Sequence, residues 1–464
     1  MAPEDDADNY WSKRGSVAHP VETGRSDPTR MSRTPPPPRT RRVASRRRWP
    51  VILIGVIVAI GAAAAVVVTR SSSGPGATSG FGLDHAPPSC SAETCVQNLL
   101  SSVSCASASF CVAVGGHGVA TGTGYSDEQP LIEMWNGSSW AIADSPDAGA
   151  GRRSLTGVSC PTTTFCVAVG QRVLPAGSSG LYAQIIETWY DRAWHLVRRE
   201  APESTELNGV ACQNNSSCVA VGKAFPKHSG LRPLIETWDG TRWSTTPSPH
   251  QNEDDFLNAV SCGEQSSCFA IGTNFSVGTG NYGQATSAES SRGSTWTLAP
   301  SVSPSAQGND LLNGVNCSFL SSCFAVGNFN TDAFSGDGNR ALIEKWHGRS
   351  WSRVATPRIR ESDVRLNGVT CATVRLCFAV GSRGSQSAHS LIEEWNGSAW
   401  ARISSPSADY FGTGTVELSG VSCVSASRCI AVGAYPDDQG TFQSLIEEWN
   451  GRVWSELVAP NVDR

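Results

Sequence analysis

One pattern is repeated seven times between residues 100 and 454 of this 464-residue chain, and the repetition constrains the fold more than any other feature. A typical copy contains two cysteines separated by five residues, a run of small and β-branched residues, an acidic and aromatic segment, and a turn between two tryptophans. The last copy reads LSGVSCVSASRCIAVG, then a loop, then SLIEEWNGRVW. A unit of this kind buries a core only against its neighbours, so the seven copies must form one array.

The length of the copies indicates a β-propeller. Their first cysteines lie 55, 52, 50, 55, 54 and 52 residues apart, and each copy shows four short strand signals and no helical periodicity. In the last copy we expect strands over about 418–423, 429–433, 444–449 and 453–458. The first and last copies are as regular as the others, which favours a closed ring over a solenoid with atypical caps. We therefore predict an all-β fold, a seven-bladed β-propeller of four-stranded blades within residues 90–464.

Fourteen of the sixteen cysteines share the Cys-x5-Cys spacing. A disulfide across the turn between the first two strands closes a short loop and contributes about 2–2.5 kcal/mol by loop entropy. A metal site is disfavoured, because each turn has two thiols and no recurring histidine completes a tetrahedral set. We predict no metal, no cofactor and seven disulfides: Cys105–Cys111, Cys160–Cys166, Cys212–Cys218, Cys262–Cys268, Cys317–Cys323, Cys371–Cys377 and Cys423–Cys429. Cys90 and Cys95 have another spacing, so they either bridge each other or remain free.

The aromatic and acidic positions of the repeat have structural explanations. The tryptophans lie five residues apart around Asn-Gly or Asp-Gly, which tolerates the positive φ of a tight type I′ hairpin. Thirteen tryptophans at equivalent positions indicate packing between blades, and the alternative is an aromatic surface for sugars. The glutamate before them shares their face of the strand, so we expect it to be buried and to accept hydrogen bonds from a neighbouring strand or an indole N–H. It occurs at Glu133, Glu187, Glu236, Glu289, Glu344, Glu393 and Glu447.

The fourth copy departs from the pattern. Residues 287–293 read SAESSRG, which keeps the glutamate but loses the apolar pair and one tryptophan. Either this blade has lost some of its packing, or its edge meets another molecule.

The N-terminal quarter of the chain has a different character. Residues 51–68 read VILIGVIVAIGAAAAVVV, and eighteen helical residues nearly cover the ~30 Å hydrocarbon layer. We predict a single transmembrane helix over 51–69, and the arginines just before it place the N-terminus inside. The competing interpretation is a cleaved signal peptide, for which the leading segment and the apolar run are both long. Residues 1–50 then form a disordered cytoplasmic tail rich in Pro and Arg, and 70–89 form a Ser/Gly/Pro linker.

These observations predict a cell-membrane protein with a single span and an extracytoplasmic C-terminal domain, where paired cysteines are oxidised. After Arg70 the chain carries 24 basic and 35 acidic residues, which excludes a nucleic-acid footprint. The partners that remain are the membrane, an extracellular protein and a cell-wall glycan.

The non-repeating sequence is confined to one side of the expected disc. In a four-stranded blade, the turns after strands one and three emerge on one face, and the segments after strands two and four emerge on the other. Only the second set varies between copies, as a binding surface requires. The candidate binding residues are its polar and aromatic side chains: Tyr125, Asp332, Asp337, Tyr410, Asp437 and Asp438.

A catalytic constellation is not evident in the sequence. No histidine recurs beside a candidate Ser or Cys nucleophile, so no catalytic residue is assigned. We therefore expect a binding or interaction module that uses the variable loops. The alternatives are a glycan-processing enzyme with two converging loop carboxylates, and a signalling or structural ectodomain.

The pattern GVSC-x5-C-x-AVG…LIExWNGxxW, over about 100–460, resembles a group of secreted bacterial repeat proteins. The hairpins at Gly137/Trp140 and Gly397/Trp400 are also similar to the Asp-box (BNR) repeat of sialidase-like propellers, with Trp where that box has Asp. Kelch-type propellers share the blade size, but their double glycine is missing. The resemblance implies a propeller superfold and implies no activity, because a fold does not carry a function.

Overall fold

The computed structural model describes residues 96–121, 124–174, 181–198, 204–227, 230–249, 255–263, 267–275, 284–305, 308–317, 319, 323–330, 338–385, 388–409 and 415–462. All of them belong to a compact unit, Asp84–Arg464, which is separate from the unit Met1–Leu83. The predicted tail, membrane segment and linker lie outside the described residues, as do Cys90 and Cys95. Among the described elements, no helix is long and apolar enough to cross a membrane.

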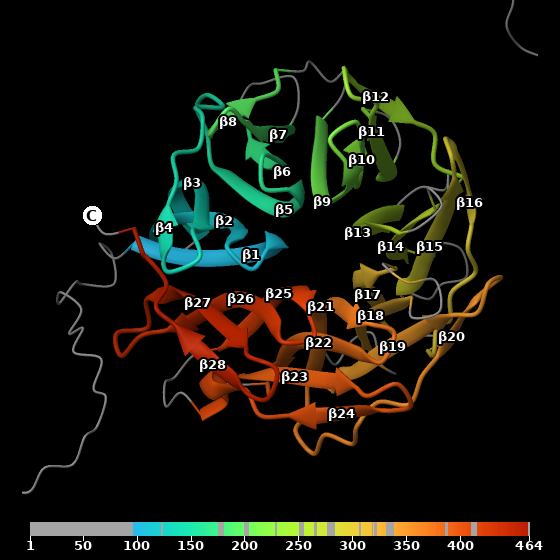
Figure 1. Ribbon diagram of the computed structural model, residues 1–464. Helices are drawn as coiled ribbons and strands as arrows, with labels where there is room; N and C mark the ends of the chain where they lie inside the picture. Colours follow the sequence, from blue (N-terminus) through green and yellow to red (C-terminus); the bar gives the residue numbers. More distant parts are fainter. Residues whose placement is uncertain are drawn as a thin grey trace, which may run out of the picture. The chain divides into compact units, whose positions relative to one another are not determined.

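Seven antiparallel sheets of four consecutive strands are arranged around a central channel (Figure 1), so the predicted all-β, seven-bladed propeller is confirmed. Blade 1 has β1 (Val96–Ser107), β2 (Phe110–Thr121), β3 (Gly124–Trp135) and β4 (Trp140–Ile142), and blade 2 has β5 (Arg153–Thr162), β6 (Phe165–Val173), β7 (Tyr182–Tyr190) and β8 (Ala193–Leu196). Blade 3 has β9 (Ser204–Asn214), β10 (Ser217–Phe225), β11 (Arg232–Trp238) and β12 (Trp243–Thr246), and blade 4 has β13 (Asp255–Cys262), β14 (Ser267–Phe275), β15 (Gln284–Arg292) and β16 (Thr295–Leu298).

The second half of the ring has the same order. Blade 5 has β17 (Asp310–Asn316), β18 (Phe324–Phe329), β19 (Arg340–Trp346) and β20 (Trp351–Arg353). Blade 6 has β21 (Val364–Thr373), β22 (Leu376–Arg383), β23 (His389–Trp395) and β24 (Trp400–Ile403), followed by the short 3-10 helix η3 (Pro406–Asp409). Blade 7 has β25 (Glu417–Ser425), β26 (Arg428–Pro436), β27 (Phe442–Trp449) and β28 (Trp454–Leu457).

The strands extend further toward the variable face than the sequence predicts. In blade 7, β26 continues to Pro436 and β27 starts at Phe442, so the expected ten-residue loop is reduced to five residues. In blade 1, most of the non-repeating segment 116–130 is a paired hairpin, with His117 opposite Gln129 and Ala120 opposite Tyr125. The pairing extends because β1 begins at Val96 and supplies the other edge of β2 with hydrogen bonds.

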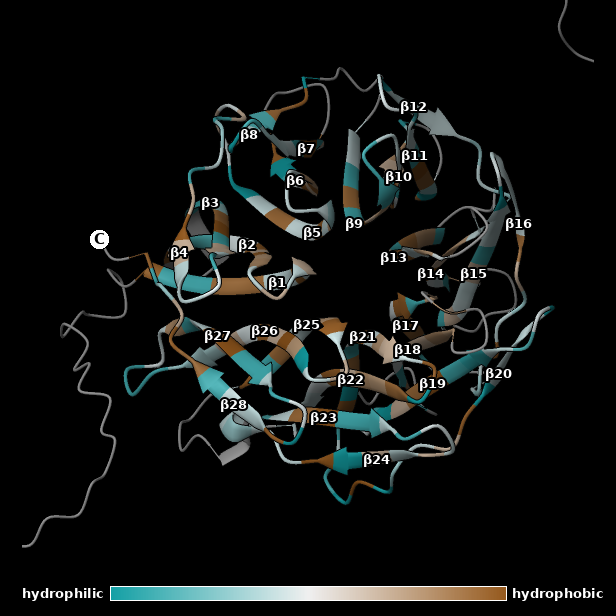
Figure 2. Cartoon of the chain, viewed as in Figure 1, coloured by the Kyte–Doolittle hydropathy of each residue, from teal (hydrophilic) through white to brown (hydrophobic). Residues whose placement is uncertain are grey.

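The hydrophobic core lies between the blades. Each of seven apolar clusters combines residues of two neighbouring blades, and alternate residues of one strand serve different neighbours. On β22, for example, Phe378 packs toward blade 7 and Ala379 packs toward blade 5. Most of the outermost strands, such as β24 and β28, are more hydrophilic than the strands inside them (Figure 2).

The repeated side chains have the expected packing roles. All seven predicted cysteine pairs are joined as disulfides. Tryptophans pack between blades as predicted: the ring of Phe378 in blade 6 lies 5.1 and 5.2 Å from the rings of Trp449 and Trp454 in blade 7. The first tryptophan of a hairpin also ties the two turns of its own blade together, since Trp135 Nε1 donates to the carbonyl of Ala108 at 3.1 Å.

The hairpin turns differ from the predicted type I′ geometry. In blade 1 only Gly137 has a positive φ, of 99°, whereas a type I′ turn requires two such residues. Four residues separate the paired tryptophans, and Asn136 Oδ1 accepts hydrogen bonds from the backbone N–H groups of Ser138 and Ser139. The prediction is wrong because the asparagine caps the turn with its side chain. Blade 2, which lacks Asn-Gly, has positive φ at both Asp191 and Arg192.

Candidate functional site

The two faces of the disc differ as the sequence predicts. The antiparallel order places the Cys-x5-Cys turns and the tryptophan hairpins on one face, which we call the turn face. The segments that follow the second and fourth strands lie on the opposite face, which we call the loop face. The non-repeating residues are therefore displayed on the loop face, around one mouth of the channel.

The candidate binding residues are only partly placed. Asp332, Asp337 and Tyr410 lie outside the described residues, and Tyr125 belongs to the extended hairpin of blade 1. Asp438 is exposed in the turn between β26 and β27. The structure therefore does not show these residues forming a common site.

Asp437 has the contacts of a turn residue. Its Oδ1 accepts hydrogen bonds from the backbone N–H groups of Gln439 and Thr441, both at 2.9 Å, and its Oδ2 accepts one from Gln443 Nε2 at 3.2 Å. An aspartate with these partners stabilises the loop itself. The side chain available to a ligand in this turn is that of its neighbour, Asp438.

The ends of blades 2, 3 and 4 carry an aromatic cluster on the loop face. We call it the aromatic row, and it consists of the partly buried side chains of Tyr182, Phe225, Phe256 and Phe275. Ring centroids of Tyr182 and Phe225 are 5.2 Å apart across blades 2 and 3, and those of Phe256 and Phe275 are 5.7 Å apart in blade 4. The row lies where β7 and β13 begin and where β10 and β14 end.

A lysine joins the two halves of the aromatic row. The Lys223 ammonium is 5.6 Å from the ring centroids of both Phe225 and Phe256, within the range of a cation–π contact. The same ammonium lies 2.7 Å from a carboxylate oxygen of Glu206, and its side chain is only 26% exposed. Aromatic rings around a partly desolvated cation are a common component of protein binding surfaces.

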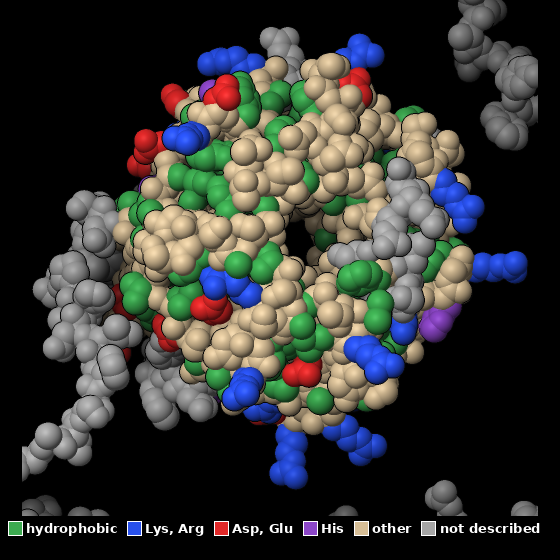
Figure 3. All heavy atoms as spheres, in the orientation of Figure 1, with side chains coloured by type: hydrophobic (Ala, Val, Ile, Leu, Met, Phe, Trp, Pro, Cys, Tyr) green, Lys and Arg blue, Asp and Glu red, His purple; other side chains and the backbone are tan. Residues whose placement is uncertain are grey.

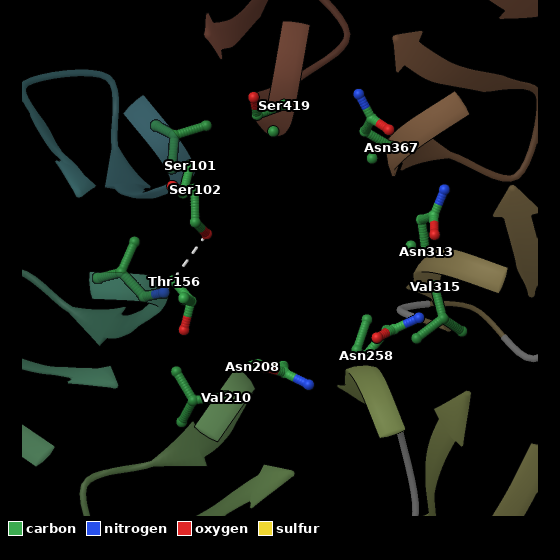
Figure 4. Close-up of a pocket in the computed structure, with 18 of the residues that line it drawn as sticks. Ser101, Ser102, Thr156, Asn208, Val210, Asn258, Asn313, Val315, Asn367 and Ser419 are labelled. Atoms are coloured by element: carbon green, nitrogen blue, oxygen red, sulfur yellow. Dashed lines mark hydrogen bonds between the residues drawn. The ribbon is translucent and has the colours of Figure 1, made fainter. Parts of the chain in front are cut away.

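The channel is lined by polar residues from every blade, at one equivalent position in each. These residues are Ser101, Thr156, Asn208, Asn258, Asn313, Asn367 and Ser419, and they surround a cavity of about 170 Å³ (Figure 4). In the space-filling view, most charged side chains lie toward the outside of the disc, away from the channel opening (Figure 3). The lining is therefore polar and largely uncharged.

Each lining residue sits at an irregularity in the first strand of its blade. The register of β17 and β18, for instance, shifts between Leu312 and Gly314, which leaves Asn313 as the extra residue of a β-bulge. Asn313 Nδ2 then donates to the carbonyl of Leu366 in the next blade at 2.9 Å. Equivalent bonds run from Asn208 to Leu257, from Asn258 to Leu312, from Asn367 to Leu418 and from Thr156 Oγ1 to Leu207, at 2.7–3.0 Å.

Close approach of the inner strands makes these bonds possible. A Cβ on Gly314 would lie 2.6 Å from the carbonyl oxygen of Asn367 and 3.0 Å from the Cα of Gly368. Serines outside the bulge add bonds between blades: Ser104 Oγ accepts from Cys160 N, and Ser422 Oγ accepts from Cys105 N across the junction of the last and first blades. The lining residues consequently hold the ring together as well as shaping the channel.

A ring of seven buried glutamates lies within the blades, as the sequence predicts. Their exposed fractions are 0–2%, and several accept a hydrogen bond from a serine of an adjacent blade, such as Ser145 to Glu187 at 2.8 Å and Ser444 to Glu133 at 2.8 Å. Burial raises the pKa of Glu133 and of Glu344 to about 8, and that of Glu187 to about 7. These groups are sealed from ligands, so their role is structural.

The described residues contain no group of three or more His, Cys, Asp or Glu side chains that could hold a metal ion. The loop face thus offers aromatic, cationic and hydrogen-bonding contacts.

Sequence reasoning missed both the aromatic row and the channel lining. The lining had a signal, because a polar residue follows the leucine of every LxxV segment. The row had a partial one, because Phe225 and Phe275 both lie seven residues after the second cysteine of their copies, whereas Tyr182 and Phe256 lie at other positions.

The fold and its two faces define the class of protein: a seven-bladed β-propeller with a disulfide in each blade. No protein-family model and no curated protein sequence matches the chain.

Several solved structures are similar. A structure of YCF48 bound to D1 peptide is 9% identical, with coverage of 76% of this chain and 94% of that chain and a TM-score of 0.44. A polysaccharide lyase, PL25 ulvan lyase, is 10% identical, with coverage of 73% and 90% and a TM-score of 0.46. The β-propeller domain of the Trilobed protease from Pyrococcus furiosus, described as having an open velcro topology, is 9% identical, with coverage of 78% and 99% and a TM-score of 0.44.

Proposed function

We propose that this protein is a membrane-anchored, extracytoplasmic binding module whose loop face engages a protein or a cell-wall glycan. The observation that supports the proposal most directly is the aromatic row. It is built from aromatic side chains of three blades, at positions where most copies have no aromatic residue, and lies on the face where all the variable sequence is displayed. Its rings are partly buried and surround a cation that already has one carboxylate partner, Glu206.

The membrane anchor is the second part of the proposal and rests on the apolar run 51–68 with its preceding arginines. An anchor at the N-terminus followed by a flexible linker would let the propeller present either face to the cell envelope. Protease protection of the N-terminal tail in intact cells, together with accessibility of the propeller from outside, is the expected result. Release of a shortened, soluble propeller would support signal cleavage instead.

The loop-face proposal is tested with the full-length protein, immobilised through its N-terminus. Secreted proteins and cell-wall fragments are captured on the wild type and on the double variant Phe225→Ala/Phe256→Ala. A ligand of the loop face should bind the wild type and bind the variant at least ten-fold less. Val453→Ser is the matched control, since Val453 is an exposed apolar residue on the turn face.

Equal capture by the wild type and the Phe225/Phe256 variant would contradict the proposal. Depolymerisation of a glycan by the wild type would favour an enzyme over a binding module, and the products would then identify the bond that is cleaved.

A further inference from the structure

A second concave surface lies at the outer edge of the disc, between blades 2 and 3. It is a cavity of about 490 Å³ between the outer strands of blade 2 and the β11–β12 hairpin of blade 3, and we call it the rim groove. Its principal side chains are Phe165, Tyr190, His195, Arg198, Trp238 and Arg242. Phe165 adjoins a Cys-x5-Cys turn and Arg242 lies in a hairpin turn, both on the turn face, whereas Arg198 follows the end of β8. No residue of the aromatic row lines the groove.

Blade 2 has small side chains beside the groove, where blades 4, 5 and 6 have a phenylalanine. In blades 4, 5 and 6 a phenylalanine follows the second cysteine and packs against the tryptophans of the next blade, as Phe324 does against Trp395 and Trp400 at 5.2 Å. The equivalent residue of blade 2 is Val167, whose cross-strand neighbour is Thr188. The tryptophans of blade 3, Trp238 and Trp243, therefore line an open cavity.

The lining combines aromatic surfaces with cations. Tyr190 is 44% exposed, and its ring stacks on the His195 imidazole with centroids 3.9 Å apart. Arg198 and Arg242 are exposed, and none of the described residues that line the groove is a carboxylate. Asp239 lies 3.7 Å from Arg242, but both side chains are more than half exposed, so the pair is weak and exchangeable.

This combination fits one class of ligand. Aromatic faces pack against the apolar C–H faces of sugar rings, guanidinium groups match the planar geometry of carboxylate and the oxygens of sulfate, and threonine hydroxyls supply further hydrogen bonds. The volume falls within the range of ordinary small-ligand sites. We propose that the rim groove binds an acidic saccharide, that is, a sugar chain carrying carboxylate or sulfate groups.

The net charge of the chain indicates which forces would hold an acidic saccharide in the groove. The chain is acidic overall, with a formal charge of −5, so long-range attraction does not favour a polyanion. Binding must then depend on short-range contacts with Arg198 and Arg242, and it should weaken as salt screens them.

The test uses calorimetric titration of the full-length protein with three probes: oligogalacturonate as a carboxylated saccharide, dextran sulfate oligosaccharide as a sulfated one, and maltooligosaccharide as a neutral one. At least one acidic probe should bind ten-fold or more tightly than the neutral probe. Arg198→Gln/Arg242→Gln should reduce that affinity at least ten-fold. The matched control is Arg452→Gln, an exposed arginine in the equivalent hairpin of blade 7, which should have no effect.

A second variant fills the groove without removing charge. Val167→Phe installs the side chain that blades 4, 5 and 6 use, and it should abolish binding while circular dichroism remains that of the wild type. If this variant does not fold, the arginine pair still decides the question. Equal binding of neutral and acidic probes, no binding of either acidic probe, or full affinity in the Arg198/Arg242 variant would overturn the proposal. Loss of saccharide binding in Phe225→Ala/Phe256→Ala alone would also overturn it, because the ligand would then occupy the loop face.

Discussion

At the scale of single residues, the buried glutamates occupy equivalent positions but differ in the hydrogen bonds that their carboxyl groups accept. Glu447 accepts hydrogen bonds from Ser405 and Ser407, whereas both carboxylate oxygens of Glu393 are buried with no hydrogen-bond partner among the described residues. Glu187 accepts a hydrogen bond from Ser145, which lies five residues after the second tryptophan of the preceding copy. At the interface of Glu393 the equivalent residue is Thr356. Burial raises the pKa of Glu393 to about 8 without the opposing effect of a donor. Ionisation of this group is therefore costly.

The stability of the propeller should fall as the pH rises from about 4.5 to about 8. Within this interval the folded protein holds the Glu393 proton more tightly than the unfolded chain, whose carboxyl has a pKa near 4.5, so unfolding releases protons. The stabilising contribution is complete below pH 4.5 and lost above pH 8. Glu133, Glu187 and Glu344 act in the same direction. Thermal unfolding followed between pH 5 and 8.5 measures the effect, and a Tm that rises with pH would contradict it.

Glu393→Gln should remove the contribution of this one group. The amide stays neutral at all pH values, so the variant should be more stable than the wild type at pH 8.5, by an amount on the order of 3 kcal/mol, and nearly equal to it at pH 5. Urea unfolding at both pH values provides the comparison. Asp438→Asn is the control, because Asp438 is an exposed side chain in a turn outside the ring of buried glutamates.

At the scale of elements, the bulged first strands surround the channel and join neighbouring blades. We call this inner ring of first strands the hub. The bulges of blades 2 to 6 each turn one polar side chain toward the next blade, so an irregularity in the ladder within a blade becomes a hydrogen bond between blades. At Gly314 and Gly368 the bulges also bring glycine backbones into contact. Figure 4 shows the polar side chains of the bulges arranged around the channel.

Asn313→Ala should destabilise the protein by about 1–3 kcal/mol, because it removes the hydrogen bond to the carbonyl of Leu366, a buried residue. Asn313→Asp should cost more, since a carboxylate oxygen would face the carbonyl oxygen. Urea unfolding measures both free energies. Ser419→Ala is a matched control at the same bulge position of blade 7, where we expect a change within about 0.5 kcal/mol. Equal losses at both positions would contradict the role of the asparagine.

At the scale of the whole molecule, the first and last blades meet without sharing a strand among those described. The junction is held by apolar packing of Leu100 and Val103 against Ile430 and Val432, and by polar contacts of β1. Phe442 N donates to Gln97 Oε1 at 2.6 Å, and Val462 N donates to Asn98 Oδ1 at 3.0 Å. The C-terminal segment thus acts as a clasp on the first strand.

Removal of residues 459–464 should loosen this junction selectively. The deletion loses the two hydrogen bonds between the side-chain amide of Asn98 and the backbone of Val462, and it should cost about 1–3 kcal/mol. Amide hydrogen exchange should accelerate most in β1 and in β25 to β27, with little change in blades 3 and 4. Asn98→Ala should reproduce part of the effect. A uniform acceleration over all blades would show that closure does not depend on the clasp.

The sequence was sufficient for the features that recur. The period of the cysteines, the spacing of the tryptophans and the position of the glutamates predicted the blades, the disulfides and the buried acids. It was insufficient where a contact depends on three-dimensional register: the partner of Asn313 is 53 positions away, and its bond exists only because a bulge redirects the side chain. Tyr182 and Phe256 lie at different positions of their copies, and the repeat does not show that each packs against the phenylalanine seven residues after a second cysteine, Phe225 or Phe275. The sequence also predicts Asp437 as a binding residue, but its carboxylate accepts hydrogen bonds from backbone N–H groups of its own turn.

The hydrogen bonds of the hub all run with the same rotational sense, from the side chain of one blade to the backbone of the following blade. As the chain is synthesised, each of blades 2 to 6 therefore presents its donor to the blade that emerges next, and these five interfaces can form in order. The junction between blades 7 and 1 must wait for the segment around Val462, whose backbone bonds to Asn98. Until that segment has emerged, the nascent propeller is an open arc with the flank of blade 1 uncovered, and that interval is when a chaperone would have a surface to hold.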